Sequence, residues 1–404
     1  MQALGARRAF LRSSFPCSRS SSSWKALGNC RAPSIVRLGR RGVGAIRSMA
    51  YEDDVRLAIK AVSLASRLCQ AVQRKLVANE TQAKADQSPV TVADYGSQAL
   101  VSWVLERELP PGTFHLIAEE DSEDLRAEDG SEMLKRITQL VNETIAADGS
   151  FGSTVLSEDD VLTAISRGDS PGGPSGRYWV LDPIDGTRGF VRGDQYAVAL
   201  GLLDNGEVVA GVLGCPNLPL ASIAANGAAS DDKAVGCVFA ASRGAGTVMQ
   251  SMDGSREAQR VYVSSVDDSK LAAFCESFEA AHSKQGLTAN IARILGVSAP
   301  PIRIDSQAKY GAMARGDAVI YLRFPHAGYR EKIWDHAAGL IVITEAGGEV
   351  FDAAGKPLDF SMGRFLDLEK GIIATNPSLR SAVLAAVQTA IKEEESALKG
   401  VSPL

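Results

Sequence analysis

Two aspartates stand three residues apart in the run Asp182-Pro-Ile-Asp185-Gly-Thr187, directly after the apolar stretch Tyr178–Leu181. Two carboxylates held this close repel each other, and the repulsion costs stability unless a cation offsets it. Hard oxygen donors with no accompanying Cys or His cluster suit Mg²⁺ better than zinc. The run therefore predicts a magnesium site, although the spacing alone names no reaction.

Further acidic side chains stand where an element is expected to begin or end. Asp94 comes directly before a helical pattern, Glu119 and Glu120 follow the apolar run 114–118, and Asp335 opens another helical pattern. Taken singly, such carboxylates more often cap helices or serve turns than bind ligands. The paired turn at 182–185 is the feature that this ordinary interpretation explains least.

Hydrophobic periodicity indicates the elements that must position these residues. Helices are expected over 53–79, 95–106, 131–147 and 335–346, the last ended by Gly347-Gly348. Strands are expected over 178–181, 196–203, 208–213, 318–322 and 348–351, with a hairpin at Asn205-Gly206. The stretch 166–176 is interpreted as a mobile surface loop. These patterns predict a mixed α and β protein of two subdomains, an N-terminal α+β metal-binding part over 51–258 and a C-terminal α/β part over 259–404.

The first 50 residues differ in composition from the rest. They contain nine Arg, one Lys and nine Ser but no Asp or Glu, a composition typical of a disordered organellar transit peptide. A chloroplast or a mitochondrion is therefore the expected location, and the cytoplasm is disfavoured. A disordered basic tail that binds an anionic partner is the alternative.

The remainder of the chain is acidic. Of the 43 basic and 48 acidic side chains in the whole sequence, 33 and 48 lie beyond residue 50, which gives a net charge of −15. A body of this charge disfavours nucleic-acid binding. No apolar run approaches the roughly 20 residues of a membrane span. The expected partner is a small molecule, and an anionic one would need local cations or metal ions.

Three blocks of the sequence resemble the inositol monophosphatase superfamily of metal-dependent phosphatases. In chain order they are Ala118-Glu-Glu120, Trp179-Val-Leu-Asp-Pro-Ile-Asp-Gly-Thr187 and Trp334-Asp-His-Ala-Ala-Gly339. Three separated blocks in the right order are more specific than one short pattern. The likeness covers about residues 51–390 and implies that superfamily's fold, the sugar phosphatase fold, a layered αβαβα sandwich of two subdomains.

Further segments narrow the resemblance to the 3′(2′),5′-bisphosphate nucleotidases. Ile304–Gly311 and Ile320–Pro325 are similar to that family, and Gly328–Asp335 is similar to its plant-type members. The family removes the 3′-phosphate from adenosine 3′,5′-bisphosphate and from 3′-phosphoadenylyl sulfate. Several members also remove the 1-phosphate from inositol polyphosphates. The resemblance thus implies a Mg²⁺-dependent phosphomonoesterase linked to sulfur assimilation and sensitive to lithium.

The resemblance also assigns roles position by position. It implies that Mg²⁺ is bound by Glu119, Asp182, Asp185, Asp335 and the carbonyl of Ile184. Asp94 and Thr187 would position and deprotonate the attacking water, and the peptide N–H groups of Gly186 and Thr187 would hold the phosphate. Glu120 would be a supporting residue or a weaker ligand.

Substrate contacts follow from the same resemblance. Ser306, Lys309 and Arg323 match positions that contact substrate in the family, and both cations are credible partners for the uncleaved phosphate. The alternative interpretation is that Lys309 and Arg323 are ordinary surface cations. His282 aligns with a family histidine near the adenosine. Directly after it this chain reads Ser283-Lys-Gln-Gly286, where relatives carry Ser-Ser-His-Asp, so the geometry around the base is left open.

Other functions are weighed against this one. An inositol polyphosphate 1-phosphatase is the nearest alternative, and the block around Ser306 and Lys309 together with Arg323 favours the nucleotide instead. A non-catalytic nucleotide sensor would keep the fold without turnover, but the full set of metal and water residues argues against it. A nucleic-acid-binding module is the weakest alternative, because the sequence shows neither a basic face nor a recognisable binding motif.

Overall fold

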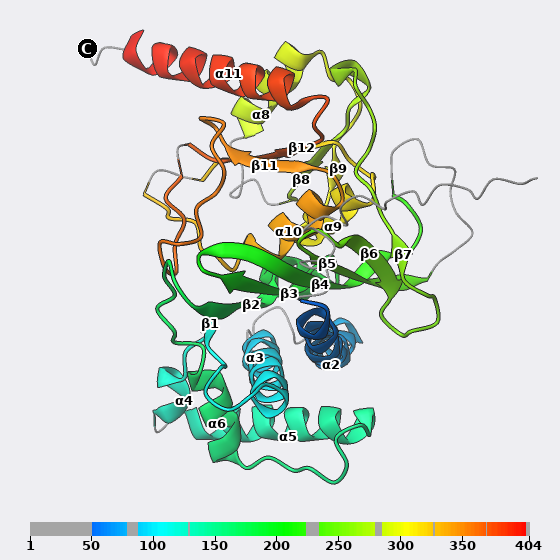
Figure 1. Ribbon diagram of the computed structural model, residues 1–404, viewed down its shortest axis with the longest axis vertical. Coiled ribbons are helices and arrows are strands. Elements are labelled where there is room, and N and C mark those ends of the chain that lie inside the picture. Colours follow the sequence, from blue (N-terminus) through cyan, green and yellow to red (C-terminus); the bar gives the residue numbers. More distant parts are fainter. Residues whose placement is uncertain are drawn as a thin grey trace, which may run out of the picture. The chain divides into compact units, whose positions relative to one another are not determined.

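Two β-sheets with a layer of helices between them form the framework of the protein (Figure 1). This computed structural model describes residues 51–78, 88–127, 130–223, 234–278, 285–325, 328–368 and 370–400, which all lie in the unit Gly42–Leu404. The predicted leader, 1–50, lies outside the described residues. Among the helices that are described, none combines the length and the apolar character that a bilayer crossing requires.

The larger sheet runs in the order β1-β2-β3-β4-β5-β6-β7. β1 and β2 are parallel, and each later pair of neighbours is antiparallel. Its strands are β1 (Leu116–Ala118), β2 (Arg177–Asp185), β3 (Ala197–Asp204), β4 (Glu207–Pro219), β5 (Val235–Ser242), β6 (Gly246–Ser251) and β7 (Gln259–Arg260).

The smaller sheet runs in the order β11-β12-β10-β8-β9. β8 is parallel to both β9 and β10, whereas β12 is antiparallel to β10 and to β11. Its strands are β8 (Phe274–Glu276), β9 (Ile302–Arg303), β10 (Ile320–Arg323), β11 (Glu349–Asp352) and β12 (Ile372–Thr375).

Helices cover both sheets and fill the space between them. They are α2 (Glu52–Ala78), α3 (Ser88–Glu108), α4 (Glu123–Arg126), α5 (Ser131–Asp148), α6 (Glu158–Ser166), α7 (Thr187–Arg192), α8 (Gln285–Leu295), α9 (Ala308–Ala314), α10 (Ala337–Glu345) and α11 (Arg380–Gly400), with a 3₁₀ turn at Ser269–Leu271. α2 and α3 cover one face of the larger sheet, α9 and α10 lie between the sheets, and α8 and α11 cover the smaller sheet (Figure 1). The predicted αβαβα layering is confirmed. The predicted subdomain boundary at residue 258 stays a prediction.

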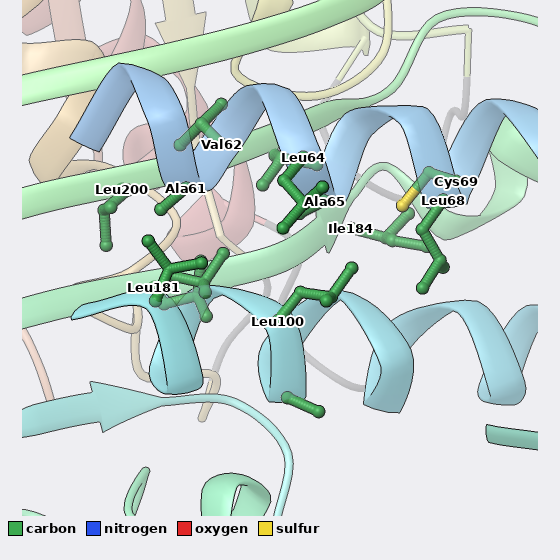
Figure 2. Close-up of a cluster of buried hydrophobic side chains, with 14 of the residues drawn as sticks. Ala61, Val62, Leu64, Ala65, Leu68, Cys69, Leu100, Leu181, Ile184 and Leu200 are labelled. Atoms are coloured by element: carbon green, nitrogen blue, oxygen red, sulfur yellow. The ribbon is translucent and has the colours of Figure 1, made fainter. Parts of the chain in front are cut away.

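The core between α2, α3 and the larger sheet fixes the strand that leads to the paired aspartates. Ala61, Ala65 and Leu68 of α2 face Leu100 of α3 and Leu181 of β2 (Figure 2), and none of these side chains is exposed. Fully burying a leucine contributes about 1.5–3 kcal/mol, and small alanines let the helix approach closely. Because Leu181 is held in this core, the residues directly after it are held as well.

Glycines let α10 close on the other face of the same sheet. A Cβ on Gly211 would lie 2.5 Å from Ile341 Cγ2, and a Cβ on Gly201 would lie 3.1 Å from Ala337 Cβ. Both glycines therefore permit a helix-to-sheet approach that a larger residue would obstruct. Since Asp335 stands two residues before α10, this packing also brings Asp335 toward β2.

Most predicted elements are confirmed. The helices predicted over 53–79 and 131–147 are α2 and α5, and the predicted hairpin is the β3–β4 turn. Asn205 and Gly206 there have φ values of 52° and 76°, as a type I′ turn requires. Of the segment 166–176, Ser166 ends α6 and the rest lacks a helix or strand, yet it is fastened to β1, because Ala118 N donates to Gly168 O at 2.9 Å.

Three boundaries were predicted wrongly, and each affects a site residue. The helix predicted to begin at Tyr95 is α3, which begins at Ser88, so Asp94 lies inside a helix rather than before it. The run Val90-Thr-Val92 favours a strand by propensity, but burial against the core overrides a weak preference. The strand predicted to end at Leu181 continues to Asp185, and Asp335 precedes α10 rather than opening it.

Candidate active site

A cleft of about 270 Å³ brings most of the predicted site residues together. Both sheets contribute to it, β2 from the larger and β10 from the smaller. The predicted residues that line it are Glu119, Asp182, Ile184, Asp185, Gly186, Thr187, Ser306, Lys309, Arg323 and Asp335. It is also lined by Arg188, Gly189, Ser277, Asp305, Gln307, Tyr310, Tyr321 and Tyr329, which the sequence did not single out.

The paired aspartates lie at an irregular end of β2. The pairing of β2 with β3 shifts register between Asp182 and Asp185, and such an irregularity re-aims side chains at functional sites. Ser97 of α3 anchors this stretch, because its buried hydroxyl donates to Pro183 O at 2.9 Å. Gly186 follows with φ at 88°, and a Cβ there would lie 2.8 Å from Ser306 Cβ. Glycine is therefore required for the turn to meet the Ser306 segment.

Glu119 and Glu120 follow β1, and the backbone on both sides of Glu119 is fixed. Gln98 of α3 donates to Glu120 O at 2.6 Å and accepts from Glu120 N at 3.1 Å. Burial, followed by the charge of Glu119, raises the pKa of the Glu120 carboxyl to about 7. Burial and the charge of Asp185 likewise raise the pKa of Glu119. At both carboxyls burial and the neighbouring acidic charge outweigh any compensation, which for Glu119 is the charge of Lys332.

Asp182 is the most confined of these carboxylates. It is 2% exposed, and its Oδ1 atom has no hydrogen-bond partner among the residues that the structure describes. Burial raises the pKa of Asp182 well above its usual value, and the charges of Glu119, Asp185, Asp335 and Asp94 add to the rise. A buried carboxylate with an unused oxygen and acidic neighbours fits a bound cation. The donor set, oxygen only, fits a hard divalent metal.

Asp94 lies near the carboxylates of Glu119, Asp182, Asp185 and Asp335, which are called the acidic group below. It is buried in α3 and lies outside the set of described residues that line the cleft. Burial raises the pKa of Asp94 well above its usual value, and Glu120 and Glu119 contribute next. Asp94 is thus electrostatically part of the acidic group. Thr187, its predicted partner, is exposed at the cleft, and its hydroxyl donates to Ile184 O at 3.4 Å.

Asp335 belongs to both the acidic group and an ion-pair network. Arg323 donates to Glu331 Oε1 at 2.7 Å and to Asp335 Oδ2 at 3.2 Å, and His336 Nε2 lies 3.2 Å from Glu331 Oε2. Burial alone would raise the pKa of Glu331, but His336 and Arg323 hold it at about 2. Burial raises the pKa of Asp335 to about 8 against the opposing charge of Arg323.

A second group of possible ligand atoms is therefore a poorer cation site. Glu331, Asp335 and His336 place one ligand atom each within 4.8 Å of one another. The guanidinium of Arg323 already neutralises the two carboxylates, so a metal ion there would have to displace it. Among the described residues, no lysine or arginine forms an ion pair with Glu119, Asp182 or Asp185, whereas Asp335 is shared between these carboxylates and Arg323.

Lys309 and Ser306 face the acidic group from α9 and the turn before it. Lys309 is only 3% exposed, so the alternative of a surface cation is wrong. Its ammonium donates to Ser277 Oγ at 3.0 Å and to Ile304 O at 3.3 Å. Burial lowers the pKa of Lys309, and the carboxylate of Asp185 opposes that change. Ser306 has φ at 68°, a conformation that costs a non-glycine residue energy and is commonest at functional sites.

Gln307 is the residue that the sequence reasoning missed most clearly. Its backbone N–H donates to Asp185 Oδ2 at 2.5 Å, and its side chain donates to Trp334 O at 2.8 Å and accepts from Gly339 N at 2.9 Å. It thereby joins Asp185 to the segment that carries Asp335. Gln307 lies inside the quoted segment Ile304–Gly311, but an uncharged amide gave no chemical signal. The predicted adenosine contact, His282, lies outside the described residues.

Comparison with known sequences decides the family. The profile described as the inositol monophosphatase family matches residues 53–392, which is most of the chain. This chain belongs to the inositol monophosphatase family. Members of this family are metal-dependent, in agreement with the acidic group around Asp182.

Individual relatives agree with this assignment. The chain is 61% identical over 356 residues to a protein of Oryza sativa named 3′(2′),5′-bisphosphate nucleotidase, covering 88% of this chain and 98% of that relative. It is 61% identical over 352 residues to 3′(2′),5′-bisphosphate nucleotidase 1 of Arabidopsis thaliana, covering 86% and 99%.

Solved structures of the family share the fold. The inositol monophosphatase of Zymomonas mobilis superposes with a TM-score of 0.52 at 20% identity, covering 84% of this chain and 99% of that one. The IMPase of Thermotoga maritima gives a TM-score of 0.52 at 17% identity with the same coverage. These identities are low, so the two structures bear on the fold alone.

Proposed function

We propose that this protein is a Mg²⁺-dependent phosphomonoesterase that removes the 3′-phosphate from adenosine 3′,5′-bisphosphate, and from 3′-phosphoadenylyl sulfate, by attack of water. The single observation that carries the proposal is the buried, cation-deficient acidic group around Asp182, which lines one cleft with buried Lys309. The two relatives at 61% identity, both named bisphosphate nucleotidases, support the substrate class.

The metal would be held by oxygen atoms of this chain. Glu119, Asp182, Asp185, Asp335 and the carbonyl of Ile184 are the proposed ligands. Bound Mg²⁺ lowers the pKa of water and offsets charge on the phosphoryl oxygens. The unused Oδ1 atom of Asp182 and the raised pKa values of its acidic neighbours support this set.

Water activation is assigned to Asp94 and Thr187. Burial and the charges of Glu120 and Glu119 raise the pKa of Asp94, so its carboxylate accepts a proton more readily than an exposed aspartate does, as a general base must. The Thr187 hydroxyl faces the cleft and can accept a hydrogen bond from water while it donates to Ile184 O. The N–H groups of Gly186 and Thr187 would hold the phosphoryl oxygens. Glu120 has a supporting role behind Glu119.

The substrate's second phosphate would be read by Lys309, with Ser306 and Arg323 beside it. Lys309 is buried and fixed by Ser277 and Ile304, so little conformational freedom is lost when an anion binds. Arg323 is 18% exposed and already bonded to Glu331 and Asp335. It is therefore held in one orientation, where its remaining donors can meet a phosphate. His282 as the adenosine contact stays a prediction.

A phosphate-release panel tests the proposal. Purified protein is supplied with adenosine 3′,5′-bisphosphate, 3′-phosphoadenylyl sulfate and inositol 1,4-bisphosphate, each with Mg²⁺ and with EDTA. We expect release from the two nucleotides that depends on Mg²⁺ and exceeds release from the inositol compound. A large preference for inositol 1,4-bisphosphate would favour an inositol polyphosphate 1-phosphatase. Nucleotide binding without release would identify a sensor.

We also propose that this protein is located in an organelle. The Arg- and Ser-rich composition of residues 1–50 supports a transit peptide. A fluorescent protein fused after residue 50 of this chain should enter a chloroplast or a mitochondrion, and the same fusion without the 50 residues should stay outside.

A further inference from the structure

Arg364 reaches the end of β1 from a segment far away in the sequence. Its Nη1 atom donates to Gly168 O at 2.9 Å and to Ser170 O at 3.2 Å, and its Nη2 atom donates to Ala118 O. Gly168 O also accepts from Ala118 N. One guanidinium therefore ties the residue before Glu119 to the loop beside it.

Arg364 also contacts the segment directly before Asp335. The Arg364 guanidinium lies 4.9 Å from the centroid of the Trp334 ring. The backbone carbonyl of Arg364 accepts a hydrogen bond from Ile333 N at 3.2 Å. Two residues later, Leu366 N donates to Glu331 O at 2.9 Å. Trp334 stands directly before Asp335, so Arg364 contacts the neighbours of two proposed ligands that are far apart in the sequence.

We propose that Arg364 is a positioning residue that sets the placement of Glu119 relative to Asp335 and thereby tunes the affinity of the site for a divalent cation. The proposal rests on the proposed function, because it takes these two carboxylates as ligands. Arg364 does not line the cleft, so it acts through Ala118 and Trp334.

The chemistry of the site explains why arginine suits this task. A planar guanidinium can donate to several carbonyls in its plane while its face lies on an aromatic ring. Here the donors meet three carbonyl oxygens, and the face meets Trp334. A lysine would keep the charge, but its single nitrogen could not span the same three oxygens and stack as well.

Gln98 and Gln307 show that other parts of the site are held separately. Gln98 of α3 fixes Glu120, and Gln307, directly before α9, fixes Trp334 O and Asp185. The contacts of Arg364 include both the backbone before Glu119 and the ring of Trp334, the residue before Asp335. Its loss should therefore alter the geometry between the two ligands rather than either ligand alone.

Cation binding measured without substrate tests the inference. The variants are Arg364→Gln and Arg364→Lys in the full chain. The matched control is Arg330→Gln, since Arg330 also stacks on an aromatic ring, that of Phe365 at 4.5 Å, but pairs with exposed Asp367. Mn²⁺, which accepts the same oxygen donors as Mg²⁺, is titrated and its free fraction is read by electron paramagnetic resonance. Melting in EDTA reports any general loss of stability.

We expect Arg364→Gln to weaken Mn²⁺ binding by roughly 10- to 100-fold, the range found when supporting partners of metal ligands are removed. Arg364→Lys should fall between Arg364→Gln and the wild type, and Arg330→Gln should bind as the wild type does. Should Arg364→Gln fail to fold, Arg364→Lys carries the measurement alone.

Wild-type Mn²⁺ affinity in the folded Arg364 variants would overturn the inference, even if their melting temperature fell, because Arg364 would then only fasten the loop. A wild-type protein that binds no Mn²⁺ would overturn both this inference and the proposed metal site. A wild-type protein that binds Mn²⁺ but releases no phosphate would overturn the proposed turnover and leave the role of Arg364 to be decided by the binding data.

Discussion

The two sides of the cleft differ in how their charges are compensated. The acidic side, formed by Glu119, Asp182 and Asp185, holds an unused carboxylate oxygen and raised pKa values for Glu119 and Asp182. The cationic side, formed by Lys309 and Arg323, is bonded within the protein to hydroxyl, carbonyl and carboxylate oxygens. Because buried charges need partners, the acidic side requires a component from outside, whereas the cationic side is already in its working arrangement.

This difference separates two kinds of functional residue. A group of like charges stores repulsion that only a ligand relieves, so its residues should cost stability when the metal is absent. A cation fixed by neutral partners and ion pairs stores little repulsion, and it contributes to substrate choice through its fixed position. Substitutions on the two sides should therefore have opposite effects on the metal-free fold.

The largest effect is expected for Asp182→Asn. Turnover with Mg²⁺ should fall by more than about a hundredfold, since loss of a ligand should exceed loss of a supporting partner. Melting of the metal-free protein should be unchanged or higher, because one buried like charge is removed. Phosphate release and melting in EDTA measure the two effects.

Asp367→Asn is the matched control, since Asp367 is an exposed partner of Arg330. It should change neither measurement. Activity at the wild-type level in Asp182→Asn would remove the acidic side from the mechanism.

A smaller and selective effect is expected for Lys309→Met, which keeps the buried volume. A charge-assisted contact to phosphate contributes about 1.5–3 kcal/mol, so kcat/KM for adenosine 3′,5′-bisphosphate should fall roughly 10- to 100-fold. Turnover of a monophosphate substrate such as adenosine 3′-monophosphate should change much less. Steady-state kinetics on the two substrates give the comparison.

Lys60→Met serves as the control, because Lys60 pairs with Glu108 at the surface. An equal loss on both substrates in Lys309→Met would show that Lys309 acts on the site in general and does not read the second phosphate.

The smallest effect is the pH dependence of the metal-free protein. Burial raises the pKa of Glu119 and Asp182 on the acidic side, and it raises the pKa of their neighbours Asp335 and Glu120 to about 8 and about 7, whereas unfolded carboxyls titrate near pH 4. Between about pH 4 and 8 the folded protein therefore binds protons that the unfolded chain has released, and its stability falls as pH rises through that window. Melting in EDTA should decrease from about pH 5 to about pH 8, and saturating Mg²⁺ should flatten the trend. A metal-free melting temperature that rises over this range would contradict the uncompensated acidic side.

Much of the site could be predicted because its chemistry is local in sequence. Asp182 and Asp185 stand three residues apart, and the blocks around Glu119 and Asp335 repeat a family pattern in the right order. Residue type alone indicated a hard cation, because carboxylates without Cys or His leave few other choices. The hairpin at Asn205-Gly206 was equally local, since its turn requires positive φ values.

The boundaries that failed were set by packing. α3 extends back to Ser88 and takes Asp94 into its interior because Val90, Val92 and Ala93 are buried against the core. Helix propensity is a property of the local sequence, so it gives no information on how much surface a distant element will bury.

The sequence by itself determined the acidic donors, their order and the layered class of the fold. Tertiary structure alone decided how they are held: by Ser97 on Pro183, Gln98 on Glu120, Gln307 on Asp185 and Arg364 on Ala118. It also decided that Lys309 is buried rather than a surface cation. The physical reason is that an amide, a hydroxyl or a guanidinium acquires a positioning role only from the backbone groups it meets. Those groups lie tens to hundreds of residues away along the chain.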